Sequence, residues 1–299
     1  MSENRAGAIR GFSAYLIWGC FPLYFKMVAE VSAREVLAHR ILWSAVFLLL
    51  LVTLTGRGKN LRKVLSSPGT VAVLLATTLL LATNWYVFIN AVFKGYVLEA
   101  SLGYFINPLV SVLLGFVFLR EKLSTRQVVS IALAAAGVLV RTVMVGKVPL
   151  VALTLAFTFG LYGLVRKAVG VQAVPGLTVE MILLSPFALG YLGWLMAGGN
   201  AVFLAGRPGL DVLLVLAGVV TSVPLVLYGG ALTRLRLSTM GIMQYIVPTG
   251  HFTLAVLAFG EPFTAAHLVS FAFIWAALAL YTSGSLGELR PTTQAAGQS

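Results

Sequence analysis

Two segments of the sequence carry polar side chains at helical spacing among apolar residues. In the first, four residues at intervals of three and four share one face of an α-helix: Ser101, Tyr104, Pro108 and Ser111. Sliding the sequence along itself until Pro108 falls on Pro248 gives a second stripe with the same spacing: Gly241, Gln244, Pro248 and His251. Hydroxyl, amide and imidazole groups form directed hydrogen bonds. The stripes therefore indicate a site that binds a ligand, or close helix packing.

Neighbouring apolar segments add side chains with an apolar body and a polar tip. Thr83, Tyr86 and Asn90 share one helical face, and four further rings occur elsewhere: Tyr15, Trp18, Tyr162 and Tyr228. Such rings stack on a planar or apolar molecule while hydrogen-bonding to its head group. We predict these residues as ligand contacts: Trp18, Tyr86, Asn90, Tyr104, Ser111, Tyr162, Tyr228, Gln244 and His251. Ordinary helix packing is the alternative.

Three prolines lie within apolar segments, at Pro22, Pro108 and Pro248. A proline removes a backbone hydrogen bond and kinks a helix, and the carbonyl it frees needs another partner or water. We predict kinks at all three positions. The kinks at Pro108 and Pro248 would flank a hydrated central path.

The sequence contains no recognisable catalytic or metal-binding motif. HExxH, P-loop, GxSxG and glycine-rich dinucleotide patterns are all missing, and Cys20 is the only cysteine. The nine acidic residues fall in tails, in loops or within about a turn of a span end; the last group includes Glu35, Glu99 and Glu180. Arg40, about one turn into its span, is interpreted as an ion pair with Glu35. We expect no enzyme activity, no cofactor and no metal.

The composition indicates that these residues lie in a membrane. Of 299 residues, 59% are hydrophobic and 10% are charged, and the mean hydropathy is +0.96, whereas a globular domain has about 25% charged residues. We predict an all-α integral membrane protein with ten spans of the length that crosses a bilayer. Their limits are Ala8–Val28, Val36–Thr55, Thr70–Phe93, Leu98–Leu119, Arg126–Val145, Pro149–Arg166, Leu177–Ala197, Leu210–Leu232, Ser238–Phe259 and Ala265–Ser283.

The basic residues predict the orientation of these spans. With the N-terminus in the cytoplasm, 14 of the 21 Lys and Arg residues fall on the cytoplasmic side. Both termini are therefore expected inside, with a disordered tail over residues 285–299. The bases that make up the net charge of +12 form short clusters between apolar runs. We therefore expect a lipid bilayer as partner and no nucleic acid.

The same alignment of the sequence with itself also indicates an internal repeat. It places Pro108 on Pro248, Glu121 on Glu261 and Ser130 on Ser270. Residues 1–146 and 147–284 would each hold five spans. Because five is odd, the second half enters the membrane with opposite polarity. Inverted repeats of this kind are common in secondary transporters, which bind substrate between the halves near the midplane.

Several strings resemble one family of membrane proteins. They include EVLAHRILWS, TNWYVFINAV, VLEASLGYFINPLVSVLLG and LSTMGIMQYIVPT, and they resemble the drug/metabolite transporter superfamily, in its RarD branch of EamA-type permeases. The resemblance implies a basket of two inverted five-helix repeats in the bacterial inner membrane. It further implies alternating access for small metabolites, with similar members linked to amino acid export and others to drug resistance.

The functional expectation is therefore an exporter of neutral or aromatic amino acids or a similar small-molecule substrate. Drug efflux of the chloramphenicol type is one alternative. A scaffold without transport activity or an intramembrane enzyme is another, from a different class. The sequence leaves open the oligomeric state and the choice between passive diffusion and proton antiport.

Overall fold

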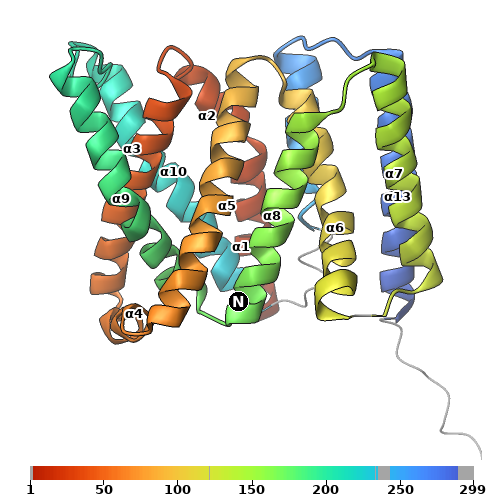
Figure 1. Ribbon diagram of the computed structural model, residues 1–299, viewed down its shortest axis with the longest axis horizontal. Helices are drawn as coiled ribbons and strands as arrows, with labels where there is room; N and C mark the ends of the chain where they lie inside the picture. The colour runs from red at the N-terminus through yellow and green to blue at the C-terminus, as the bar shows by residue number, and fades with distance from the viewer. Residues whose placement is uncertain (1–2, 121, 233, 235–242, 289–299) are drawn as a thin grey trace, which may run out of the picture.

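The computed structural model describes residues 3–120, 122–232, 234 and 243–288, and the described residues form helices and no strand (Figure 1). In chain order these are α1 (Glu3–Gly19), α2 (Phe21–Met27), α3 (Ala33–Leu54), α4 (Gly58–Leu65), α5 (Pro68–Phe93), α6 (Val97–Leu119), α7 (Thr125–Val145), α8 (Leu150–Val169), α9 (Ala173–Ala197), α10 (Pro208–Leu232), α12 (Ile246–Thr253), the π-helix η1 (Leu254–Ala258) and α13 (Ala265–Glu288). The long helices stand side by side, and α4 lies across one end of the bundle.

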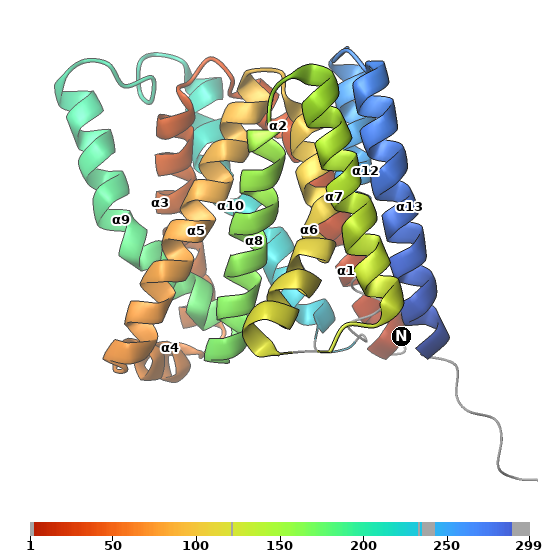
Figure 2. The same cartoon turned by 45° about the vertical axis from the view of Figure 1, so that its right-hand side comes forward.

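Seven of the described helices are long and apolar enough to cross a membrane, namely α3, α5, α6, α7, α9, α10 and α13. The segments Leu150–Arg166 in α8 and Ile246–Ala258 in α12 and η1 are shorter apolar helices. The first helix begins and the last helix ends at the same end of the bundle (Figure 2). The protein is therefore a multi-pass membrane protein, as the composition predicts.

The first predicted span is two helices rather than one kinked helix. The first helix closes at Gly19, where the N–H of Cys20 donates to the carbonyls of Leu16 and Ile17. Pro22 is the second residue of α2. A proline in the first turn of a helix costs little, because the N–H that it lacks has no partner inside the helix. Pro22 thus begins a helix, which corrects the predicted kink.

Other boundaries also differ from prediction. The short α4 occupies a predicted loop and carries Lys59, Arg62 and Lys63 with no buried residue, which is typical of a helix at a membrane surface. The last helix continues to Glu288 and so includes residues 285–288 of the predicted tail. Glu121, Gly241 and the predicted start of the ninth span at Ser238 lie outside the described residues.

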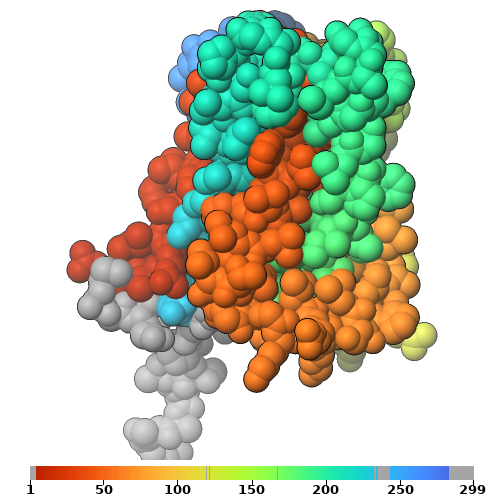
Figure 3. Space-filling view, turned by 90° about the vertical axis from the view of Figure 1, so that its left-hand side faces the viewer, coloured from red at the N-terminus to blue at the C-terminus, as the bar shows by residue number. Residues whose placement is uncertain are grey.

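The helices pack in pairs that join the two halves of the chain. Helix α3 packs on both α9 and α10 (Figure 3), α6 packs on α12, and α7 packs on α13. Helix α5 packs against α8, and α10 packs against α1. Gly19 of α1 lies against Gly250 of α12, and Gly160 of α8 lies against Val110 of α6. Helices from different halves therefore meet throughout the bundle.

Two carboxylates, buried Glu35 and half-buried Glu261, hold chain segments together at the end opposite α4. Glu35 accepts hydrogen bonds from the N–H groups of Val202 (2.9 Å) and Phe203 (3.3 Å). Glu261 accepts from the N–H groups of Val97 and Leu98, both at 2.8 Å. The first N–H groups of a helix have no partner inside it. Glu261 therefore caps the start of α6 from a segment that is distant in the sequence.

Glu261→Ala should lower the stability of the protein by about 2 kcal/mol, because it leaves two N–H groups at the start of α6 without an acceptor. The measurement is the thermal unfolding midpoint in detergent. Glu30→Ala is the control, since Glu30 pairs with Arg207 and both side chains are more than half exposed. An exposed ion pair of this kind contributes about 0–1 kcal/mol. Equal midpoints for the two variants would contradict the capping role.

Candidate functional site

A polar chain joins three helices in the middle of the bundle. The hydroxyl of Tyr104 on α6 donates to Oδ1 of Asn84 on α5 at 3.2 Å. The Nδ2 atom of Asn84 donates to the carbonyl of Leu155 at 3.0 Å and to Oγ1 of Thr158 at 2.9 Å, both on α8. Asn84 is 2% exposed. A buried amide with all these partners fixes where the Tyr104 hydroxyl lies.

His251 of α12 connects this chain to α1. Its Nε2 lies 3.0 Å from the carbonyl oxygen of Trp18. A carbonyl only accepts hydrogen bonds, so Nε2 carries the hydrogen and Nδ1 is the acceptor. Nδ1 is buried and has no partner among the described residues. The imidazole stacks on Phe88 at 5.0 Å between centroids and meets the edge of Tyr104 at 5.5 Å.

Aromatic rings extend the cluster on both sides. Tyr15, Trp18 and Tyr228 contact one another at centroid distances of 5.6 to 5.9 Å. On the other side Phe159 of α8 contacts Tyr104 at 6.5 Å and Tyr162 at 6.0 Å. Four of these rings are only partly buried, although they lie between helices: Trp18, Tyr104, Tyr162 and Tyr228. Amphipathic rings with remaining free surface are suited to stacking on a small molecule.

The two predicted polar stripes face each other. Gln244 Nε2 donates to Oδ1 of Asn107 on α6 at 3.3 Å, and Asn107 donates in turn to the carbonyl of Ala156 at 3.0 Å. The hydroxyl of Ser101 donates to the carbonyl of Pro248 at 2.8 Å. The segments that carry the two stripes therefore meet at the centre of the protein.

Three predicted contacts lie away from this cluster. These are Ser111, Tyr86 and Asn90. Ser111 is exposed, and so is Thr83, which shares a helical face with Tyr86 and Asn90. Within the described residues, the side chains of Tyr86 and Asn90 form no hydrogen bond or ring contact with the cluster. The central face of α5 carries Asn84 and Phe88 instead. A two-residue difference turns a side chain by about 200° on a helix, and both faces of α5 carry polar groups.

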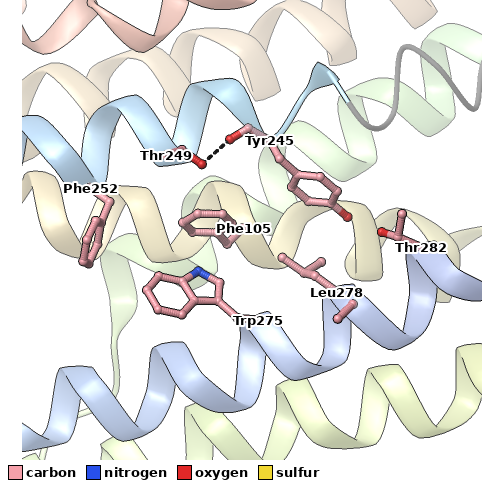
Figure 4. Close-up of a pocket in the computed structure, with 8 residues that line it drawn as sticks. Phe105, Tyr245, Thr249, Phe252, Trp275, Leu278 and Thr282 are labelled. Carbon is pink, nitrogen blue, oxygen red and sulfur yellow. Dashed lines mark hydrogen bonds between the residues drawn. The ribbon is translucent and has the colours of Figure 1, made fainter.

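A separate apolar groove lies between α6, α12 and α13 (Figure 4). Its volume is about 470 Å³, and its lining includes Phe105, Phe252, Trp275 and Leu278. The hydroxyl of Thr249 in this groove donates to the carbonyl of Tyr245, so it is satisfied within its own helix. An apolar groove of this kind suits a lipid chain better than a polar metabolite.

Comparison with known proteins identifies the family. Residues 5–143 match the EamA-like transporter family. The chain is 42% identical to Protein RarD of Escherichia coli (strain K12), covering 98% of this chain and 99% of that protein. It is 45% identical to an uncharacterized transporter of Vibrio cholerae, with 95% and 94% covered. The chain belongs to the EamA-like transporters, as a RarD-like permease of the drug/metabolite transporter superfamily.

Two further comparisons concern the name of a relative and the fold. The permease is 32% identical to the Chloramphenicol-sensitive protein RarD of Pseudomonas aeruginosa, over 94% of each chain. A solved crystal structure covers 94% of the permease and 98% of its own chain, at 19% identity and a TM-score of 0.60. That likeness concerns the fold alone.

The two prolines of the polar stripes, Pro108 and Pro248, lie in helices of different regularity in the permease. Pro108 lies inside α6, which continues through it from Val97 to Leu119. Pro248 lies in α12, which passes into the π-helix η1 after Thr253. Single π-helical turns occur often at functional sites. The helix after Pro248 is therefore irregular, whereas α6 is regular on both sides of Pro108.

Two buried charged residues, Glu180 and Arg40, have other positions or partners than the sequence predicts. Glu180 is not near a helix end, because it is the eighth residue of α9 and is fully buried. It accepts from Thr77 at 2.6 Å and Tyr162 at 3.3 Å, and lies 3.9 Å from Arg166. Arg40 does not pair with Glu35, whose carboxylate binds backbone N–H groups instead. The sequence could not reveal either arrangement, because both depend on contacts between distant helices.

Proposed function

We propose that this protein exports small metabolites, most specifically neutral and aromatic amino acids, by alternating access around the central cluster. The observation that carries the proposal is the joining of α1, α5, α6, α8 and α12 by His251, Tyr104 and Asn84. The cluster combines stacking rings with amide, hydroxyl and imidazole groups, which suits a small molecule with an apolar body and a polar head. Trp18, Tyr162, Tyr228 and Gln244 complete it.

We further propose ten membrane crossings arranged as two inverted five-helix repeats, residues 1–146 and 147–284. The pairing of helices supports this: α3 with α9, α6 with α12 and α7 with α13 are corresponding helices of the two halves. The contact of Gly19 with Gly250 resembles that of Gly160 with Val110, because the repeat places Val110 on Gly250 and Gly19 within one residue of Gly160. Rocking one half against the other would expose the cluster to each side in turn.

The proposed location is the bacterial inner membrane, with both termini in the cytoplasm. The basic helix α4 lies at the end of the bundle that holds the start of α1 and the end of α13 (Figure 1). Cytoplasmic ends of membrane proteins carry the excess of Lys and Arg. This orientation makes the end with Glu35 and Glu261 the outer end.

Drug efflux is the second candidate. It is favoured by the similarity to the Chloramphenicol-sensitive protein RarD and by the aromatic character of the cluster, which also suits chloramphenicol. A transport measurement separates the two substrates.

Counterflow in proteoliposomes tests the proposal. Liposomes holding the purified protein are loaded with one unlabelled amino acid, and uptake of the same labelled amino acid is followed at equal pH on both sides. Threonine, methionine and phenylalanine are compared with chloramphenicol, and empty liposomes are the control. We expect counterflow of at least one amino acid without a pH gradient. Counterflow of chloramphenicol alone would replace export of amino acids by drug efflux.

A further inference from the structure

Arg40 is a buried cation that forms no ion pair with any acidic residue the structure describes. It is the eighth residue of α3 and is 3% exposed. Its Nε donates to Oγ1 of Thr221 on α10 at 2.7 Å, and its Nη1 is buried and has no hydrogen-bond partner among the described residues. Among the described residues, ion pairs join Arg141 to Glu99, Arg166 to Glu180 and Arg207 to Glu30, and none includes Arg40.

Aromatic rings surround the guanidinium. Its central carbon lies 3.9 Å from the ring centroid of Trp85 and 5.5 Å from the centroids of Phe21 and Phe25. Ring faces attract a cation, but they supply no acceptor in the plane of the guanidinium. The rings therefore hold Arg40 in place. The N–H groups of its Nη1 stay available to a ligand.

The position that corresponds to Arg40 in the other half is Glu180, a buried charge that has a counter-charge and hydrogen bonds. Glu180 is the eighth residue of α9, as Arg40 is of α3, and the shift that places Pro108 on Pro248 also places Arg40 on Glu180. Glu180 has a counter-charge in Arg166 and hydrogen bonds from Thr77 and Tyr162. A buried charge inside a membrane is costly without such partners and marks a functional site by default. The contacts of Arg40 within the described part of the chain are those with Thr221 and the rings.

We propose that Arg40 binds the carboxylate of the transported substrate, which makes this protein a carrier of carboxylate-bearing molecules. Guanidinium groups bind carboxylates through two parallel hydrogen bonds, and the low dielectric of the interior strengthens them. Phe25, which packs on the guanidinium, contacts Phe88 at 5.8 Å between centroids, and Phe88 contacts Tyr104. A carboxylate on Arg40 therefore leaves the substrate body next to the central rings. The inference rests on the proposed export function and deepens it.

The conformation described here encloses the guanidinium, since Phe21, Phe25 and Trp85 are all buried. Binding therefore requires the short α2, which carries Phe21 and Phe25, to move away from α3 and α5. The break between α1 and α2 at Cys20 lets this segment move without unfolding either helix. A substrate carboxylate would then replace the ring contacts on one side of Arg40.

The first test uses the unmodified protein and pairs of ligands that differ only in the carboxylate. Phenylalanine, methionine and threonine are each compared with their primary amides as competitors of amino acid counterflow and as stabilisers in thermal unfolding. 3-Phenylpropionate, which keeps the carboxylate and lacks the ammonium group, is a third arm. We expect the amides to be at least about 30-fold weaker than the acids, which corresponds to about 2 kcal/mol. 3-Phenylpropionate should still compete.

Variants of the arginine give the second test. Arg40→Gln should remove the preference for acids over amides, and Arg40→Lys, which keeps the charge but not the planar fork, should weaken acid binding by about 3- to 10-fold. Arg34→Gln is the matched control, because it removes the same charge from an exposed position on the same helix. It should leave the preference unchanged. If Arg40→Gln does not fold, the ligand pairs and Arg40→Lys still decide the question.

The outcomes separate this inference from the proposed function. Counterflow of an amino acid with equal competition by acid and amide would overturn the role of Arg40 and leave export intact. Counterflow of no amino acid would reject amino acid export. In that case, stabilisation by the acids and not by the amides would still support carboxylate binding at Arg40, and stabilisation by neither would overturn it.

Discussion

Gly218→Ala should lower the unfolding midpoint by about 6 °C or more and reduce the amount of folded protein in the membrane. Gly218 of α10 lies directly against the backbone of α3, and a Cβ atom there would be 2.3 Å from the carbonyl carbon of Trp43 and 2.4 Å from its oxygen. Backbone cannot yield as a side-chain end does, so the two helices must separate. Overpacking of this kind costs about 3 kcal/mol.

Gly193→Ala is the control for this effect. Gly193 lies in α9, and a Cβ atom at that position would meet nothing within 4 Å. In a helix, alanine is favoured over glycine by up to about 1 kcal/mol, so this variant should unfold at the same temperature or higher. Size-exclusion profiles recorded after heating give both midpoints. Unchanged stability in Gly218→Ala would show that α3 and α10 are less tightly packed than described.

Tyr104→Ala should reduce amino acid counterflow at least about tenfold at normal membrane abundance. The substitution removes the hydroxyl bonded to Asn84 and the ring that contacts Phe88, Phe159 and His251. A substrate would lose a stacking surface at the centre of the cluster, and Asn84 would lose a partner. Truncating a residue at the centre of a binding site typically costs about 2 kcal/mol or more.

Tyr86→Ala provides the comparison, because Tyr86 lies on a neighbouring helix and is also half-buried. Its side chain forms no hydrogen bond or ring contact with the cluster among the described residues. We expect its counterflow to stay within about twofold of the unmodified protein. Initial rates normalised to reconstituted protein are the measurement. If Tyr86→Ala is the more damaging variant, the central face of α5 is the one with Tyr86 and Asn90, and the proposed cluster is wrong.

Buried Glu180 affects the question of energy coupling. The sequence leaves open the choice between passive diffusion and proton antiport, and it places no carboxylate in the middle of a predicted span. Glu180 lies two turns inside α9, however, and it bonds to Tyr162, one of the central rings. Counterflow measured with and without a pH gradient, in the unmodified protein and in Glu180→Gln, compares the two mechanisms directly.

The stripe on α6 illustrates what helical periodicity predicts well. The spacing places Ser101 and Tyr104 on one face of a helix, and in the structure Ser101 bonds to Pro248 while Tyr104 contacts His251. On α5 the same reasoning selected Tyr86 and Asn90, whereas the cluster uses Asn84 and Phe88. Periodicity shows which residues share a face, but it does not show which neighbour that face meets when two faces carry polar groups.

The sequence by itself determined the membrane environment, most helix positions and the two polar stripes, because each follows from local composition and spacing. The break at Cys20, the capping by Glu261 and the surroundings of Arg40 were decided only by the tertiary structure. Arg40 meets Thr221 on α10 and Trp85 on α5, both far from it in the sequence. A side chain two turns inside a span has the same sequence signature whether it meets a carboxylate, a lipid head group or a ring. Only the packing of helices from both halves leaves this arginine buried with no counter-charge among the residues that the structure describes.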